Sequence, residues 1–217
     1  MRNALDLLFP GGRLVAEWMT GTILTVLALA SNPDGETVND DLTGPLDRWP
    51  FEPDRLVARI IELEGDRRLL QIRVELGILQ MELRGRPDGG KDRLSSVEAM
   101  VLKEPEFKID GPLAAELRSE AVQVHQRYVA LLGLECFDLV VEDTSRNLRM
   151  FDLCRDRGCD ADDRTVLEQF RPQVLATRAR AASLIAIGNR QTSVARDIID
   201  VAVNDIRAAY PDGAPEP

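Results

Sequence analysis

The chain has 217 residues, 44% of them hydrophobic and 29% charged, which suits a soluble globular protein of one large or two small domains. Its formal net charge of −10 disfavours broad nucleic-acid binding, because such binding needs lysine and arginine to neutralise phosphates. Cys154 and Cys159 are five residues apart, and no partner pair of Cys or His completes a zinc set with them, while an odd count of three cysteines does not suggest a disulfide framework. We expect no metal ion and no other cofactor.

The first fifty residues are expected to form an apolar segment followed by a linker. The apolar segment covers 14–30 and ends in the run ILTVLALA at 23–30, which is either part of a core or a signal for export. No run reaches the roughly 20 apolar residues of a membrane-spanning helix. We therefore expect a cytoplasmic protein, or an exported one if 1–30 act as a signal. Residues 32–53 are rich in Pro, Gly, Asp and Asn, which is typical of a linker.

Alternation of apolar and polar residues predicts strands in the next segment. The alternation holds from Leu70 to Ile78, and it has the period of a half-buried strand. We expect two antiparallel strands at about 57–64 and 68–76, joined by a tight turn. Gly77 is expected to form a β-bulge, because the alternation shifts phase after it. The competing interpretation is helical: a helix over 54–64 and, if 69–83 is helical as well, an all-α fold.

A turn and a short helix follow the strands. The segment RGRPDGG at 84–90 is expected to be a turn. It approaches the phosphate-binding pattern G-x-x-x-x-G-K-[ST], but Asp92 stands where that pattern needs Ser or Thr, so we expect no nucleotide. Ser95 and Glu98 match a capping box and predict a helix over 96–102.

Four longer helices are predicted in the C-terminal half. The first opens on a Gly-Pro pair after Asp110 and ends near Gly133. The others are expected at about 135–156, 164–187 and 194–209. Pro172 divides the third of these helices, because an interior proline breaks the backbone hydrogen bonding. The result is two helix–turn–helix hairpins, with turns at Gly133 and Gly188.

The predicted fold class is therefore α+β and mainly α, with a small antiparallel β-hairpin followed by two antiparallel helical hairpins. All-α is the alternative. The expected division has four parts: an N-terminal segment and linker over 1–53, a β-hairpin and connector over 54–110, a helical-hairpin domain over 111–210 and a disordered tail over 211–217.

Two resemblances suggest a function. Residues 133–148 (GLECFDLVVEDTSRNL) and 188–206 resemble the turn and second helix of tetratricopeptide repeats, which implies paired helices that bind a peptide. The runs LGILQME at 76–82 and GRPDG at 85–89 resemble uncharacterised bacterial proteins, some of which are labelled as having a UvrB/UvrC-type motif. That second resemblance implies an accessory factor in nucleic-acid repair or processing.

No catalytic set is evident. His125 lies one turn before Tyr128, and as a general base it would need an orienting carboxylate and a nucleophile that no motif supplies. We expect it to be half-buried and hydrogen-bonded to a neighbour. The carboxylates and arginines between 142 and 164 do not follow calcium-loop spacing, and we expect them to form a solvated, salt-bridged face. Arg178, Arg180 and Arg190 form a small basic zone.

The best-supported function is a non-enzymatic interaction or scaffolding module that binds a peptide or partner protein through paired helices. The candidate partner-binding residues are Arg86, Asp88, His125, Tyr128, Arg178 and Arg180. The alternatives are a nucleic-acid accessory factor and an enzyme that uses His125. A nucleic acid is the less favoured partner, and the sequence does not determine the oligomeric state.

Overall fold

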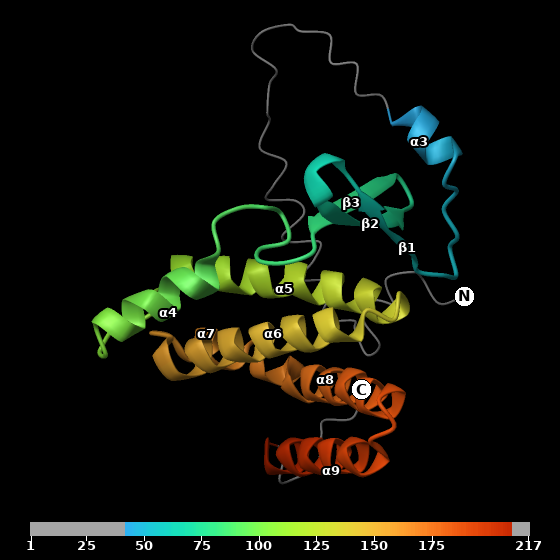
Figure 1. Ribbon diagram of the computed structural model, residues 1–217. Coiled ribbons are helices and arrows are strands. Elements are labelled where there is room, and N and C mark those ends of the chain that lie inside the picture. Colours follow the sequence, from blue (N-terminus) through green and yellow to red (C-terminus); the bar gives the residue numbers. More distant parts are fainter. Residues whose placement is uncertain (1–41, 210–217) are drawn as a thin grey trace, which may run out of the picture. The chain divides into compact units, whose positions relative to one another are not determined.

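A computed structural model describes residues 42–209, and Figure 1 labels their helices and strands. The apolar segment expected at 14–30 and the tail expected at 211–217 lie outside the described residues. The described chain divides into two compact units. The first holds 42–58 and 72–79, and the second holds 59–71 and 80–209.

Three strands form one sheet: β1 (Val57–Glu62), β2 (Arg68–Val74) and β3 (Gly77–Glu82), in the order β1-β2-β3. The connections are too short for crossovers, so neighbouring strands run antiparallel. The strands predicted at 57–64 and 68–76 are confirmed, each ending two residues earlier than expected. The helix considered for 54–64 and the all-α fold are wrong, because 57–62 pairs with β2 as a strand of the sheet.

Gly77 is not a β-bulge, which corrects the prediction. Glu75 and Leu76 form a two-residue turn, and Gly77 begins β3. The shift in alternation therefore marks a reversal of chain direction. A row of side-chain hydrogen bonds links the three strands. Arg59 donates to Gln71 Oε1 at 2.9 and 2.8 Å, and Gln71 Nε2 donates to Gln80 Oε1 at 2.8 Å.

The described end of the expected linker contains a short helix, α3 (Thr43–Asp47). In the first unit, the segment after this helix covers Arg73 of β2. The Arg73 guanidinium donates to the carbonyl of Trp49 at 2.7 Å and lies 6.0 Å from the centroid of the Phe51 ring. Arg73 lies on the central strand of the sheet, and it is buried because this segment covers it.

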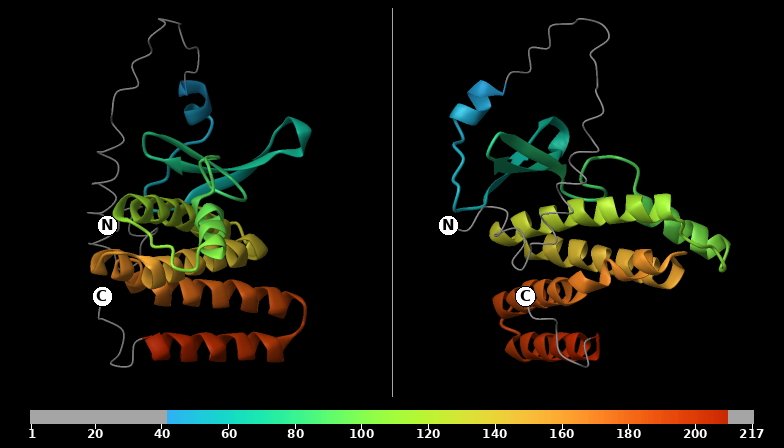
Figure 2. Two further views of the ribbon diagram at one scale, coloured as in Figure 1. Left: turned by 90° about the vertical axis from the view of Figure 1, so that its left-hand side faces the viewer. Right: turned by 180° about the vertical axis from the view of Figure 1, so that it is seen from behind.

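The second unit contains six α-helices among its described residues. They are α4 (Arg93–Lys103), α5 (Gly111–Gly133), α6 (Phe137–Arg157), α7 (Ala161–Thr165), α8 (Arg171–Gly188) and α9 (Thr192–Ala209). Figure 2 shows the long helices in successive layers: α5 packs on α6, α6 on α8, and α8 on α9. The mainly-α, α+β prediction is confirmed, and the long helices lie within a few residues of their expected ranges.

Local caps explain where the helices begin. The capping box predicted at Ser95 and Glu98 is wrong as a start signal. The Asp92 carboxylate accepts a hydrogen bond from the Ser95 N–H at 2.8 Å, so α4 begins at Arg93. Pro172 stands in the first turn of α8, where its missing N–H costs nothing. The predicted division before it is present as α7 and a short 3-10 turn.

The two hairpin turns share one geometry. Gly133 and Gly188 are the last residues of their helices, yet neither has positive φ. The left-handed positions are Glu135 (φ 58°) and Arg190 (φ 60°), two residues further on. In both turns the next N–H donates to the carbonyl five residues earlier, at 2.9 and 2.8 Å. This bond closes the helix end in the manner of a Schellman motif.

Candidate functional site

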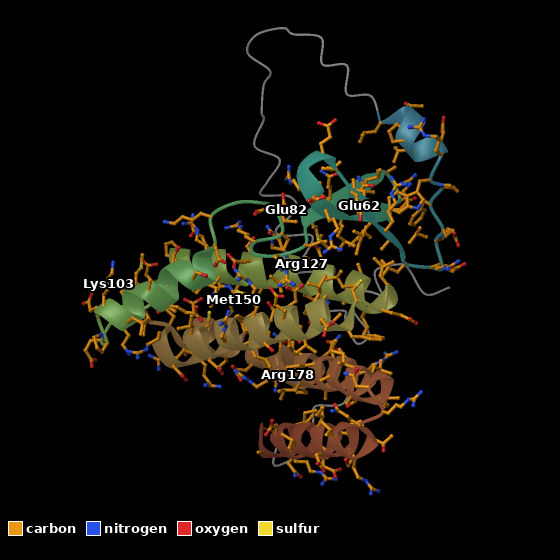
Figure 3. All side chains as sticks on the ribbon, in the orientation of Figure 1. Glu62, Glu82, Lys103, Arg127, Met150 and Arg178 are labelled. Carbon is orange, nitrogen blue, oxygen red and sulfur yellow. The ribbon has the colours of Figure 1, made fainter. Side chains whose placement is uncertain are left out.

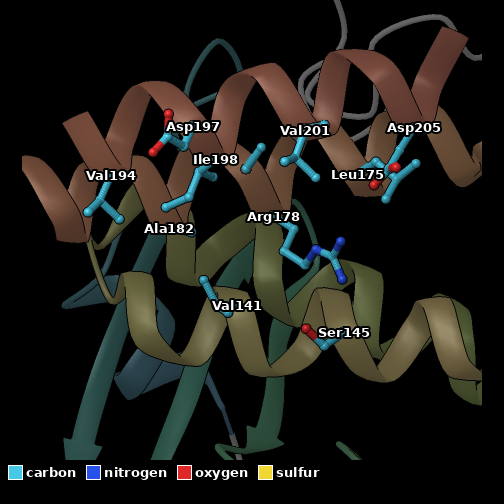
Figure 4. Close-up of a pocket in the computed structure, with 12 residues that line it drawn as sticks. Val141, Ser145, Leu175, Arg178, Ala182, Val194, Asp197, Ile198, Val201 and Asp205 are labelled. Atoms are coloured by element: carbon cyan, nitrogen blue, oxygen red, sulfur yellow. The ribbon is translucent and has the colours of Figure 1, made fainter. Parts of the chain in front are cut away.

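A groove of about 490 Å³ lies between α6, α8 and α9, and Figure 4 shows the side chains along it. We call it the α9 groove. Its apolar lining residues are Val141, Leu175, Ala179, Ala182, Val194, Ile198, Val201 and Ala202. Its polar lining residues are Ser145, Arg178, Asp197 and Asp205. The groove therefore combines an apolar lining with charges of both signs.

The groove exists because α9 has more apolar surface than α8 covers. The helices α8 and α9 pack together, with the Ser183 hydroxyl donating to the Ala195 carbonyl at 3.3 Å, and small residues on both helices are buried: Ala179, Ala186, Ala195 and Ala202. Larger apolar side chains of α9 lie beside this contact. Val194 is 44% exposed and Val201 is 58% exposed, both in the groove, and Ile199 and Val203 are exposed outside it. Large apolar groups that gather on one surface mark an interaction site more often than scattered ones do.

The charged residues of the groove are also unpartnered. Within the part of the chain that the structure describes, Arg178, Asp197 and Asp205 make no ion pair. Ion pairs do form in other helices, for example between Arg118 and Asp163 and between Arg171 and Asp152. Within residues 42–209, the larger apolar side chains of this surface therefore stay partly uncovered, and its charged side chains form no ion pair.

A second cluster of charges is buried, and its contacts are structural. Arg127 on α5 is 1% exposed and forms a double hydrogen bond to the Asp143 carboxylate of α6, at 2.8 and 2.6 Å. Its remaining Nη1 donates to the carbonyl of Glu82 at 2.8 Å, and Figure 3 labels both residues. Burial raises the pKa of Asp143, and the Arg127 guanidinium opposes that rise.

Arg146 and Glu120 extend this buried polar region. Glu120 is fully buried, accepts the Arg93 backbone N–H at 2.9 Å and pairs with Arg146. Arg146 also pairs with Asp92 at 2.8 Å. Burial raises the pKa of Asp92, but hydrogen bonds from Arg146 and from the Ser95 N–H outweigh it and lower the pKa overall. The solvated face expected over 142–164 is thus wrong for Asp143 and Arg146, and also for Asp163, which is buried and pairs with Arg118.

Arg86 and Asp88 face each other within the turn at 84–90. Asp88 accepts from Arg86 Nε at 3.0 Å, from the Gly90 N–H at 2.9 Å and from Gln123 Nε2 of α5 at 3.1 Å. Gly85 and Gly89 both have positive φ, as a tight turn requires. The expected turn is confirmed, and the side chains of Arg86 and Asp88 have hydrogen-bond partners within the chain.

His125 is half-buried and contacts Tyr128, as expected. Its Nδ1 lies 2.5 Å from the Tyr128 hydroxyl, and the rings meet edge to face with centroids 4.9 Å apart. Burial raises the pKa of Tyr128, so its hydroxyl stays protonated. No group of three or more His, Cys, Asp or Glu side chains within the described residues could hold a metal ion.

The structure separates the two arginines predicted on α8. Arg178 lines the α9 groove, whereas Arg180 is exposed two residues further along, on the opposite side of the helix. The predicted residues therefore form two local pairs, Arg86 with Asp88 and His125 with Tyr128, and do not form one site.

Sequence reasoning missed the α9 side of the groove. The available signal was the apolar stripe of α9, which is wider than one neighbouring helix can cover.

No protein-family model, curated protein or solved structure matches the chain. The tetratricopeptide and UvrB/UvrC resemblances therefore stay predictions. Within residues 42–209, no helix has the length and apolar content to cross a membrane.

Proposed function

We propose that the chain is a non-enzymatic interaction module that binds a partner protein in the α9 groove. One observation carries the proposal: exposed apolar side chains and unpaired charges line the same hollow. Hydrophobic contact supplies most of the free energy of protein association, and charges at the rim mainly add specificity and speed of encounter. Both are available on this surface.

The residue types in the groove favour binding over catalysis. A nucleophile needs a neighbouring base that activates it. Among the described residues that line the groove, Ser145 carries the one hydroxyl and none is histidine or cysteine. The residues around it suit recognition of a shape and a charge pattern.

Photo-crosslinking from Val201 tests the proposal, with Val203 as a matched control. Both are exposed valines of α9, but only Val201 lines the groove, because two residues along a helix face opposite sides. A photoreactive amino acid at each position is activated in the native cell. We expect a discrete protein adduct from position 201 and none from position 203. Equal adducts from both positions, or none from position 201, would overturn the proposal.

A further inference from the structure

The described residues that line the α9 groove all belong to helices, and this determines what can bind there. The backbone N–H and C=O groups inside α6, α8 and α9 are used in their own helical hydrogen bonds. An extended peptide would bury its backbone groups without partners, which is costly. A helix satisfies its own backbone and offers only side chains to the groove. The occupant is therefore expected to be helical.

The spacing along α9 indicates how such a helix would pack. Val194, Ile198, Val201 and Asp205 follow one another at intervals of four, three and four residues. This is the spacing of a heptad seam, in which two helices pack with a small crossing angle. A partner helix would place its apolar residues at the same intervals against the three aliphatic side chains.

The charges indicate the electrostatic character of the partner. Asp197 and Asp205 both lie on the α9 side of the groove, eight residues apart, which corresponds to about 12 Å along a helix. Figure 4 shows the Arg178 side chain extending from α8. We infer that the groove binds an amphipathic helix of a partner protein with two basic residues about two turns apart, one for each aspartate. This inference rests on the proposed function of the groove.

A membrane surface fits this face less well than a protein helix does. Amphipathic helices that bind anionic lipids have a basic polar face. The charged residues of α9 are two arginines and three aspartates, a net charge of −1. The same excess of aspartate disfavours a nucleic acid.

Two synthetic peptides test the inference by binding to the full-length chain. Both are 18-residue amphipathic helices with leucine at heptad spacing, and they differ only at two positions eight residues apart, which are lysine in one and glutamate in the other. Calorimetry with the unmodified chain is expected to show about tenfold tighter binding of the lysine peptide, the effect of two exposed charge pairs. The double variant D197K/D205K is expected to reverse the preference.

The matched control is D200K, which changes an α9 aspartate that does not line the groove. It is expected to leave the preference for the lysine peptide unchanged, and circular dichroism melts check that every variant is folded. If the two peptides bind equally well, the inferred preference for two basic residues is wrong, although the groove still binds a helix. If neither peptide binds although Val201 forms its adduct, the helical occupant is wrong. Sedimentation that shows a dimer disrupted by Val201→Asp would overturn the inference in favour of a second copy.

Discussion

The buried pair of Arg127 and Asp143 provides the most quantitative test of the fold. Changing Arg127 to Met keeps an unbranched side chain of similar length but removes all three hydrogen bonds that the guanidinium donates. Asp143, 3% exposed, then has no cationic partner at this position, and the Glu82 carbonyl loses its donor. Removing one member of such a buried pair costs about 3–5 kcal/mol of unfolding free energy, a large part of the roughly 5–15 kcal/mol typical of a folded protein.

Urea denaturation followed by circular dichroism measures this loss. The double variant R127M/D143L is expected to be more stable than R127M, because it leaves no buried charge behind. The matched control is Arg84→Met, which removes an ion pair to Glu142 that is largely exposed. That change is expected to cost less than about 1 kcal/mol. A loss below about 1 kcal/mol for R127M would refute the structural role assigned to the pair.

Three further predictions concern turns, pH and thiols. Glu135→Gly and Arg190→Gly each remove a left-handed non-glycine residue and are expected to raise the unfolding free energy by about 0.5–1 kcal/mol, whereas a decrease would contradict the turn geometry. The lowered pKa of Asp92 means that its charge stabilises the fold above about pH 4, and that this contribution is lost as the pH falls through the folded-state pKa. Asp92→Asn keeps a helix cap, so acid titration of stability should be shallower below pH 4 in this variant, and an unchanged slope would exclude the effect. Burial raises the pKa of the Cys154 thiol to about 11, so a thiol reagent at neutral pH should modify exposed Cys159 first and Cys154 only after unfolding, as peptide mass spectrometry can show.

The local structure was largely predictable, because it depends on neighbouring residues. The alternation before Gly77 predicted β2, but a phase shift in alternation has two explanations, an inserted residue or a two-residue turn. Only the pairing of β2 with β3 decides between them. The capping box at Ser95 failed for a similar reason, since Asp92 caps the same helix three residues earlier.

The site was less predictable, because it depends on contacts between distant helices. Arg127 and Asp143 are 16 residues apart on different helices, and nothing in their local sequence shows that they meet. The groove depends on which part of the apolar surface of α9 its neighbour covers. The apolar residues of α9 are visible in the sequence, but only the packing of α8 on α9 identifies Val194 and Val201 as exposed.

The central claim is that the α9 groove is the partner-binding surface. The direct measurement compares Val201→Asp with Val203→Asp in a titration of the partner captured through position 201. Both variants place a carboxylate on an exposed position of the same helix, so their stabilities should be alike. We predict that Val201→Asp weakens binding at least about tenfold, the effect of losing a buried aliphatic contact, and that Val203→Asp binds as the unmodified chain does. Equal affinities for the two variants would contradict the claim.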